Sequence, residues 1–150
     1  MEIQNAKIKN FVSSEPKRVL VVDDQQSVLD LVKDFLISMG FEVITALNGE
    51  RALHLLKKEF PHILITDILI PHLDGFSLVK EVRKMENGKK LPIIMMSGLY
   101  KDLKMKKRVT KEYHADFLIK PFSLRELNKK VQKIFPKDKH SFPNSPTIIN

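Results

Sequence analysis

The chain of 150 residues is 43% hydrophobic and carries a formal net charge of +8, a length and composition typical of one domain with a single core. It contains no cysteine, which excludes a disulfide framework and a thiolate metal site and fits a reducing, cytoplasmic compartment. No apolar run is long enough to span a bilayer and the first residues lack a secretory signal, so we expect a soluble protein without a membrane partner.

The two ends of the chain differ in pattern from its middle. Residues 1–16 show no sustained hydrophobic period and are expected to form a flexible arm. Residues 136–150 contain three prolines and are expected to form a flexible tail or the start of a linker. The predicted domain therefore covers residues 17–135.

Two periodicities alternate through this domain. Runs rich in branched side chains predict five strands, at residues 18–22, 41–45, 62–66, 91–96 and 116–119. Apolar residues at helical spacing predict helices at about residues 26–39, 48–59, 75–85 and 124–135. Strands that alternate with helices indicate right-handed crossovers and a mostly parallel α/β sheet covered on both faces, with the third strand at its centre.

A further helix, the fourth in chain order, is predicted between residues 103 and 113, where a thin apolar stripe lies among many lysines. Its stability must come mostly from packing. Residues 1–99 carry 13 basic and 13 acidic side chains, whereas residues 100–135 carry 11 and 4. Such local charge attracts an acidic partner or phosphates only if it lies on one accessible face. A solvated helix surface explains it equally well, and both interpretations stay open.

Acidic residues follow two of the predicted strands. Asp23 and Asp24 end the first strand, and Asp67 ends the third. Because polar chemistry in parallel sheets gathers at the carboxyl ends of strands, we expect these residues to share one site. Neighbouring carboxylates repel one another and are costly to bury unpaired, so the cluster requires a cation. Carboxylate oxygens favour Mg²⁺ in that position.

Two more polar side chains at strand ends complete a site suited to phosphoryl transfer. Ser97 follows the fourth strand and Lys120 follows the fifth. A bound Mg²⁺ would leave Asp67 nucleophilic and neutralise an incoming phosphoryl group, while the lysine and the hydroxyl would support an aspartyl phosphate. No glycine-rich phosphate loop is present, so ATP is not the expected direct substrate.

Each of these features has a simpler explanation when taken alone. The Asp23-Asp24 pair resembles a helix cap, and Ser97-Gly98 and Lys120-Pro121 resemble ordinary turns. The five histidines match no ligand spacing, and we interpret them as structural or surface residues. Only the combination at successive strand ends indicates a site.

Together, four motifs resemble the receiver domain of two-component response regulators. The motifs are Val21-Val22-Asp23-Asp24, the segment from Asp67 to Gly75, Ser97-Gly98 and Lys120-Pro121-Phe122. The resemblance covers about residues 17–135. It implies a flavodoxin-like (βα)5 fold, a doubly wound parallel sheet of five strands in the order 2-1-3-4-5. It also implies a signalling switch that catalyses only its own phosphorylation and dephosphorylation.

The resemblance implies a role for each residue of the site. Asp67 accepts a phosphoryl group from a phosphohistidine of a sensor histidine kinase or a histidine phosphotransfer protein. Lys120 pairs with the phosphoryl group, and Ser97 hydrogen-bonds it. The implied Mg²⁺ ligands are Asp24, Asp67, the backbone carbonyl of Leu69 and, through water, Asp23.

The resemblance also implies a conformational switch. Ser97 moves toward the phosphoryl group, and the ring of Phe117 follows into the vacated space, although taken alone Phe117 is more simply a core residue. Phenylalanine lacks the hydroxyl that tyrosine would offer there. Output then passes through the fourth helix, the fifth strand and the last helix, within residues 100–135, to a partner, to an output domain or to a phosphorylation-dependent homodimer.

Several alternatives stay open. The chain is either a stand-alone receiver or the receiver portion of a longer, DNA-binding regulator whose output domain would follow the tail. A Mg²⁺-dependent phosphohydrolase would also form an aspartyl phosphate. Such enzymes typically carry an Asp-x-Asp motif at the nucleophile strand, but the residue two positions after Asp67 is Leu69. Direct nucleic-acid binding by residues 100–135 is open too, although they contain no recognisable reading motif.

Two apolar residues predict a long-lived phosphoryl group. By resemblance, Leu69 and Leu99 flank the path of the water that hydrolyses the aspartyl phosphate, and leucine offers that water no hydrogen bond. We therefore expect slow self-dephosphorylation.

Overall fold

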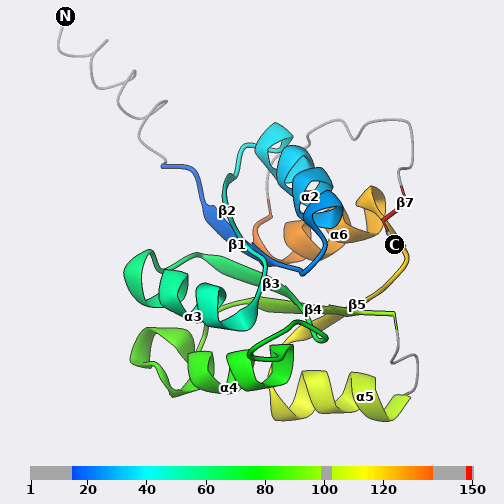
Figure 1. The fold of residues 1–150 in the computed structure, drawn as a ribbon. Coiled ribbons are helices and arrows are strands. Elements are labelled where there is room, and N and C mark those ends of the chain that lie inside the picture. Colours follow the sequence, from blue (N-terminus) through cyan, green and yellow to red (C-terminus); the bar gives the residue numbers. More distant parts are fainter. Residues whose placement is uncertain (1–14, 99–102, 137–147, 150) are drawn as a thin grey trace, which may run out of the picture.

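A central sheet of five parallel strands organises the computed structural model, which describes residues 15–98, 103–136 and 148–149 (Figure 1). The strand order is β2-β1-β3-β4-β5, and every neighbouring pair is parallel. This confirms the predicted flavodoxin-like topology. The strands are β1 (Arg18–Val22), β2 (Glu42–Ala46), β3 (Ile63–Asp67), β4 (Ile93–Ser97) and β5 (Asp116–Ile119).

Three predicted strands begin later than expected, at residues 42, 63 and 93 in place of 41, 62 and 91. Phe41 and Leu91 are both buried, but neither belongs to the sheet ladder. The N–H group of Phe41 donates to the carbonyl of Leu36 at a helix end, and that of Leu91 donates to the carbonyl of Gly88 in a turn. Burial therefore extends beyond the strand, so hydrophobicity alone misplaces its start.

Helices cover both faces of the sheet (Figure 1). The helices α2 (Gln26–Ser38) and α6 (Leu124–Ile134) lie on one face, and α3 (Gly49–Lys58), α4 (Gly75–Lys84) and α5 (Leu103–Lys107) lie on the other. Successive strand residues point to opposite faces, so each strand supplies two apolar clusters. Leu20, Leu64 and Met95 belong to the cluster under α3 and α4, whereas Val21, Ile65 and Met96 belong to the cluster under α2 and α6.

Side-chain caps fix the starts of three helices. The carboxamide of Asn48 accepts the N–H of Arg51 at 2.8 Å, and the carboxylate of Asp74 accepts the N–H of Ser77 at 3.0 Å. Ser123 and Glu126 form a reciprocal capping box at the start of α6. These bonds satisfy N–H groups that would otherwise lack partners in the first turn.

The predicted fourth helix is present but irregular. Its first part, α5, continues as the π-helical segment η2 (Arg108–Glu112), and a 3₁₀ turn, η1 (Glu86–Gly88), follows α4 earlier in the chain. Arg83 holds the end of η2 in place, because its guanidinium donates to the carbonyls of Tyr113 and His114 and to those of Gly88 and Leu91.

A short antiparallel pair lies beside the main sheet. The strand β6 (Phe122–Ser123) follows β5 and pairs with β7 (Ile148–Ile149) near the end of the chain. Among the described residues, no helix is long and apolar enough to cross a membrane.

Gly75 and Gly98 provide a test of how closely the backbone packs near the carboxyl ends of the strands. A Cβ atom on Gly75 would lie 2.5 Å from the carbonyl oxygen of Asp67 and 2.7 Å from the Cα of Ile68, so the backbone would have to move. We expect Gly75→Ala to lower the free energy of unfolding by about 1–3 kcal/mol in urea denaturation.

Gly98→Ala is the matched control, because its Cβ would meet Lys120 only at ordinary contact distances of 3.4 and 3.5 Å. We expect its unfolding free energy to equal that of the wild type or to exceed it slightly. Equal losses in the two variants would contradict the packing argument.

Candidate functional site

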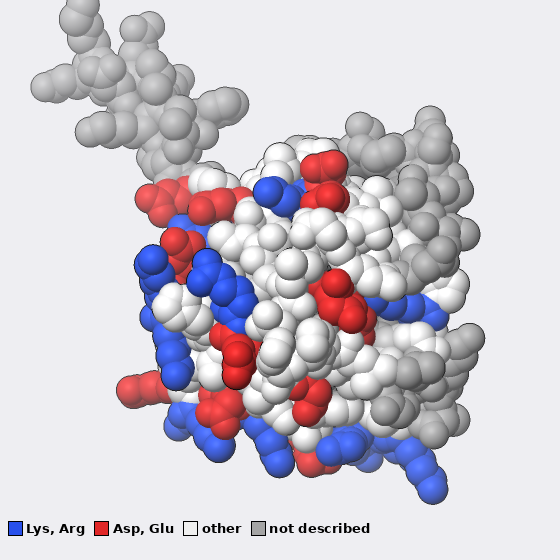
Figure 2. All heavy atoms as spheres, viewed as in Figure 1, with Lys and Arg blue, Asp and Glu red and all other residues white. Residues whose placement is uncertain are grey.

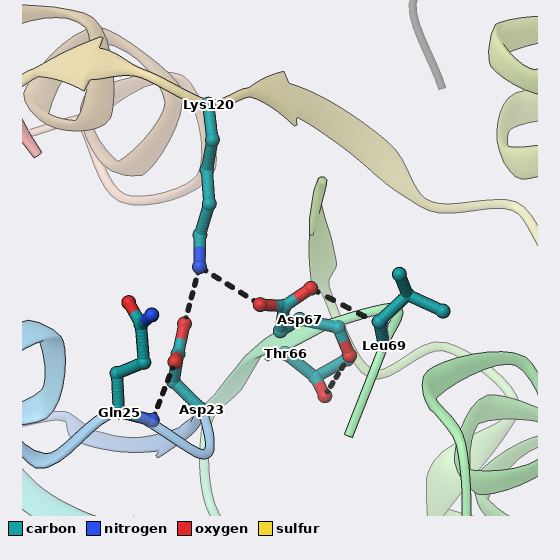
Figure 3. A network of polar contacts seen from close by, with 6 residues as sticks. All are labelled: Asp23, Gln25, Thr66, Asp67, Leu69 and Lys120. Carbon is teal, nitrogen blue, oxygen red and sulfur yellow. Dashed lines mark hydrogen bonds and ion pairs between the residues drawn. The ribbon is translucent and has the colours of Figure 1, made fainter. Parts of the chain in front are cut away.

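A partly buried lysine joins two of the three predicted carboxylates (Figure 3). The ammonium of Lys120, the first residue after β5, donates to Oδ2 of Asp23 at 2.6 Å and to Oδ2 of Asp67 at 2.8 Å. Asp23 follows β1 and is fully buried, and Asp67 ends β3 and is 8% exposed. The carboxyl ends of three strands therefore supply one ion-paired cluster, as the sequence predicts.

The second oxygen of Asp67 is held by the turn that follows its strand. Oδ1 accepts the N–H of Leu69 at 3.1 Å, and the hydroxyl of buried Thr66 donates to the Asp67 backbone carbonyl at 3.0 Å. Both carboxylate oxygens and the main chain of Asp67 are thus fixed by neighbours (Figure 3). Such a carboxylate is oriented before any ligand arrives.

Asp23 is held in the same way, but at an electrostatic cost. Its Oδ1 accepts the N–H of Gln25 at 2.9 Å. Burial, supported by the nearby negative charge of Asp67, raises the pKa of Asp23 above its ordinary value, and the contacts with Lys120 and Gln25 only partly oppose this rise. The ionised form of Asp23 is therefore stabilised less than it would be in water.

The environment of Lys120 has the opposite effect on its charge. Burial by itself disfavours the ammonium, but the hydrogen bonds and the attraction of Asp23 and Asp67 outweigh burial, so the pKa of Lys120 is raised. The lysine remains protonated at neutral pH and supplies the cation that the carboxylates require.

An open pocket of about 400 Å³ lies over this cluster. Asp24, Asp67, Leu69 and Ser97 line it, together with Gln25, Gly98, Lys120 and Pro121. Ser97 is buried at the end of β4, whereas Asp24 is exposed. The pocket therefore brings a carboxylate, an ammonium and a hydroxyl to one place.

The three carboxylates also suit a divalent metal ion. Asp23, Asp24 and Asp67 each offer one oxygen, and these oxygens lie within 4.8 Å of one another. Hard oxygen ligands of this kind are those that Mg²⁺ prefers, and the open side of the pocket leaves room for water molecules to complete its coordination.

Among the predicted residues that the structure describes, Asp23 and Phe117 do not line the pocket, although Asp23 contacts Lys120 beneath it. Phe117 is buried in β5 within the cluster under α3 and α4, and Leu99 falls outside the described residues. Conversely, Gln25 and Thr66 contact the acidic residues without having been predicted. Their adjacency to Asp23 and Asp67 in the sequence is the only signal that could have indicated them.

The raised pKa of Asp23 predicts a trade-off between stability and function. Since the pKa is higher in the folded protein, the contribution of Asp23 to stability is greatest below its ordinary pKa of 3.8 and is lost as the pH rises through the folded value. We therefore expect Asp23→Asn, without Mg²⁺, to unfold at a higher urea concentration than the wild type at pH 7. The difference should shrink as the pH falls toward 3.8.

Asp24→Asn is the control, because Asp24 is exposed and its substitution should change the urea midpoint little. A lower midpoint for Asp23→Asn than for the wild type at pH 7 would contradict the prediction.

Comparisons with known proteins agree with this geometry. The family model described as the response regulator receiver domain matches residues 19–132. A curated relative, the probable transcriptional regulator ycf27 of Porphyra purpurea, is 36% identical over 125 residues, which cover 82% of this chain and 49% of the relative. The chain thus spans about half the length of the curated relatives it matches.

Solved structures show the same fold. Chemotaxis protein CheY4 of Vibrio cholerae is 34% identical with a TM-score of 0.74, and the match covers 81% of this chain and all of that one. The receiver domain of sensor histidine kinase PA1611 of Pseudomonas aeruginosa, solved with a magnesium ion in its active-site cleft, is 25% identical with a TM-score of 0.70, covering 79% of this chain and 97% of that one. The chain belongs to the response regulator receiver family.

Proposed function

We propose that Asp67 accepts a phosphoryl group from a phosphohistidine of a sensor histidine kinase or a histidine phosphotransfer protein. The observation that carries this proposal is the bridge from Lys120 to Asp23 and Asp67 at the floor of an open pocket. A carboxylate held at both oxygens can attack a phosphorus atom without first having to be oriented.

The chemical step follows from the groups in the pocket. An oxygen of Asp67 forms a bond to phosphorus while the P–N bond of the phosphohistidine breaks, and the electron pair of that bond returns to the imidazole. The ammonium of Lys120 lies 2.8 Å from Asp67, close enough to pair with the transferred oxygens. The hydroxyl of Ser97, at the end of β4, lines the same pocket and can donate to them.

Mg²⁺ is the proposed cofactor, with Asp23, Asp24, Asp67 and the Leu69 backbone carbonyl as its site. When bound, it neutralises charge on the phosphoryl oxygens. The chain's own residues hold the acceptor carboxylate in place and shield one side of it from water. The acidic residue at position 69 that a phosphohydrolase would use as an acid or base is replaced by leucine.

The switch is proposed to run from Ser97 to Phe117. The two residues lie on neighbouring strands, where Met95 pairs in register with Phe117 and Ser97 with Ile119. Movement of the Ser97 hydroxyl toward a phosphoryl group would change the packing around the buried ring.

The proposed output surface lies within residues 100–135. Lysines of α5 and η2 are exposed, and Figure 2 shows lysine and arginine side chains along the lower margin of the molecule, where α4 and α5 lie in Figure 1. An accessible row of positive charge suits an acidic partner surface or phosphates. The same surface could form the phosphorylation-dependent homodimer.

A second proposal concerns the whole protein. The chain matches only about half of relatives whose names describe them as transcriptional regulators. We therefore also propose that this receiver serves in a longer regulator with a nucleic-acid-binding output domain. The open reading frame that encodes residues 136–150 distinguishes this arrangement from a stand-alone receiver.

The phosphoacceptor is tested by incubation with acetyl phosphate or beryllium fluoride, with and without Mg²⁺, followed by intact-mass or binding measurements. We expect Mg²⁺-dependent modification of the wild type and none in Asp67→Asn. Asp74→Asn is the control, because Asp74 is an exposed helix cap and asparagine caps equally well. Modification that persists in Asp67→Asn would refute the assignment.

The lifetime of the phosphoryl group is tested at Leu69, which is 45% exposed and lines the pocket. We expect a long lifetime in the wild type, shortened by about tenfold or more in Leu69→Asn, because an amide can hold the hydrolytic water.

Leu47→Asn is a matched control, since Leu47 is equally exposed but is absent from the pocket lining. A wild-type lifetime that is already short and is unaffected by Leu69→Asn would contradict the proposal that Leu69 slows hydrolysis of the aspartyl phosphate.

A further inference from the structure

The strand β7 docks beside the pocket of Asp67. Ile149 pairs with Phe122 and Ile148 with Ser123, and both partners directly follow Pro121, which lines the pocket. Figure 1 shows β7 beside the start of α6, on the side of the sheet where the strands end. Residues 148–149 are therefore held against the two residues that follow the pocket wall at Pro121.

Ile149 is part of the core and not a loose surface contact. Only 2% of the residue is exposed, and it belongs to the apolar cluster that contains Val28, Leu29 and Phe122. Val28 and Leu29 lie in the first turn of α2, directly after Gln25, which is another residue of the pocket wall. The surface that β7 covers is thus apolar at Phe122 and borders the pocket at the neighbouring residue, Pro121.

The attachment of β7 is nevertheless small. It consists of two residue pairs, and a two-stranded pair by itself is marginally stable in water. Short segments with few buried contacts open at a small fraction of the global unfolding free energy. β7 is therefore a cover that can be removed without unfolding the domain.

The docked β7 should affect small phosphoryl donors and protein phosphoryl donors differently. A small phosphoryl donor such as acetyl phosphate fits within a pocket of about 400 Å³ and needs no contact beyond it. A protein donor must extend one histidine side chain into the pocket while its own surface rests on the surrounding residues, among them Gln25 and Pro121. β7 pairs with Phe122, the residue that follows Pro121 in the chain.

We propose that β7 is a removable cover over a docking surface for protein phosphodonors, formed around Phe122 beside the pocket residue Pro121. With β7 docked, small donors reach Asp67 but a phosphohistidine protein does not seat fully. With β7 displaced, the exposed apolar surface binds that protein. This inference rests on the proposed function, since it concerns access to the same phosphoacceptor.

A reversible lock tests the proposal. Ser123 and Ile148 are direct partners in an antiparallel pair, where Cα atoms lie about 4.5–5.5 Å apart, within the range that a disulfide spans. Since the chain has no cysteine, the full-length double variant Ser123→Cys/Ile148→Cys can form only this intramolecular disulfide. Its reduced form is its own control, because it carries the same substitutions.

The readout is the rate of phosphorylation from two donors, acetyl phosphate and a histidine phosphotransfer protein charged with phosphoramidate. Oxidation should leave the acetyl phosphate rate unchanged and slow transfer from the protein by at least about tenfold, the effect of denying a central part of an interface. Reduction should restore it. Equal effects on both donors, no effect on either, or failure of the disulfide to form would overturn the proposal.

Ile149→Asp provides the opposite change, because a buried unpaired carboxylate should release β7. We expect faster transfer from the phosphotransfer protein and an unchanged rate with acetyl phosphate. Asn150→Asp is the control, since it adds the same charge one residue further on.

If neither Ile149→Asp nor the reduced double variant accepts phosphate from the protein donor, the docking surface is refuted. If acetyl phosphate fails with every form, the proposed function itself is wrong.

Discussion

The ion pairs of Lys120 with Asp23 and Asp67 are the interaction on which the rest of the site depends. Two carboxylates this close, one of them fully buried, repel each other unless a cation lies between them. Lys120 follows the edge strand β5 and must reach past the end of β4 to the ends of β3 and β1. It does so only if the parallel register of four strands is correct, so the electrostatics of the site and the order of the sheet constrain each other.

The sequence predicts this arrangement well because parallel strands end at a common edge. The acidic residues, Ser97 and Lys120 all follow apolar runs, so a correct count of strands places them together without knowledge of any distance. Other features depend on tertiary contacts and leave no such pattern. The docking of β7 places two isoleucines after a segment with turn-forming composition. The π-helical η2 differs from an α-helix in its backbone hydrogen bonds, such as the bond from the N–H of Tyr113 to the carbonyl of Arg108, and the apolar spacing of the sequence does not record that difference. Gln25 and Thr66 act through single hydrogen bonds that no periodicity records.

The basic segment of α5 and η2 is only partly available to a partner. Arg108 lies over the ring of Phe76 at 4.4 Å and pairs with Glu112 at 3.5 Å, so its side chain contributes to the packing of η2 against α4. The lysines at positions 104, 106, 107 and 111 are exposed and have no such role among the contacts of the described residues. Arg108 therefore has a structural role, whereas the four lysines are available to solvent or to a partner. This division is compatible with both interpretations of the basic segment, an acidic or phosphate-bearing partner and a solvated helix surface.

The packing around η2 indicates where the signal proposed to start at Asp67 can act. Arg83 donates to the carbonyls of Tyr113 and His114 at the C-terminal end of η2 and also to those of Gly88 and Leu91, so it ties that end of η2 to the segment that follows α4. By contrast, Leu69, Met105 and Arg108 line an open pocket of about 440 Å³ between the turn after β3 and the helical segment α5–η2. A rearrangement of the turn at Leu69 therefore meets little resistance there, whereas the other end is clamped. The physical expectation is a pivoting motion, in which α5 moves and the end of η2 near Arg83 stays fixed.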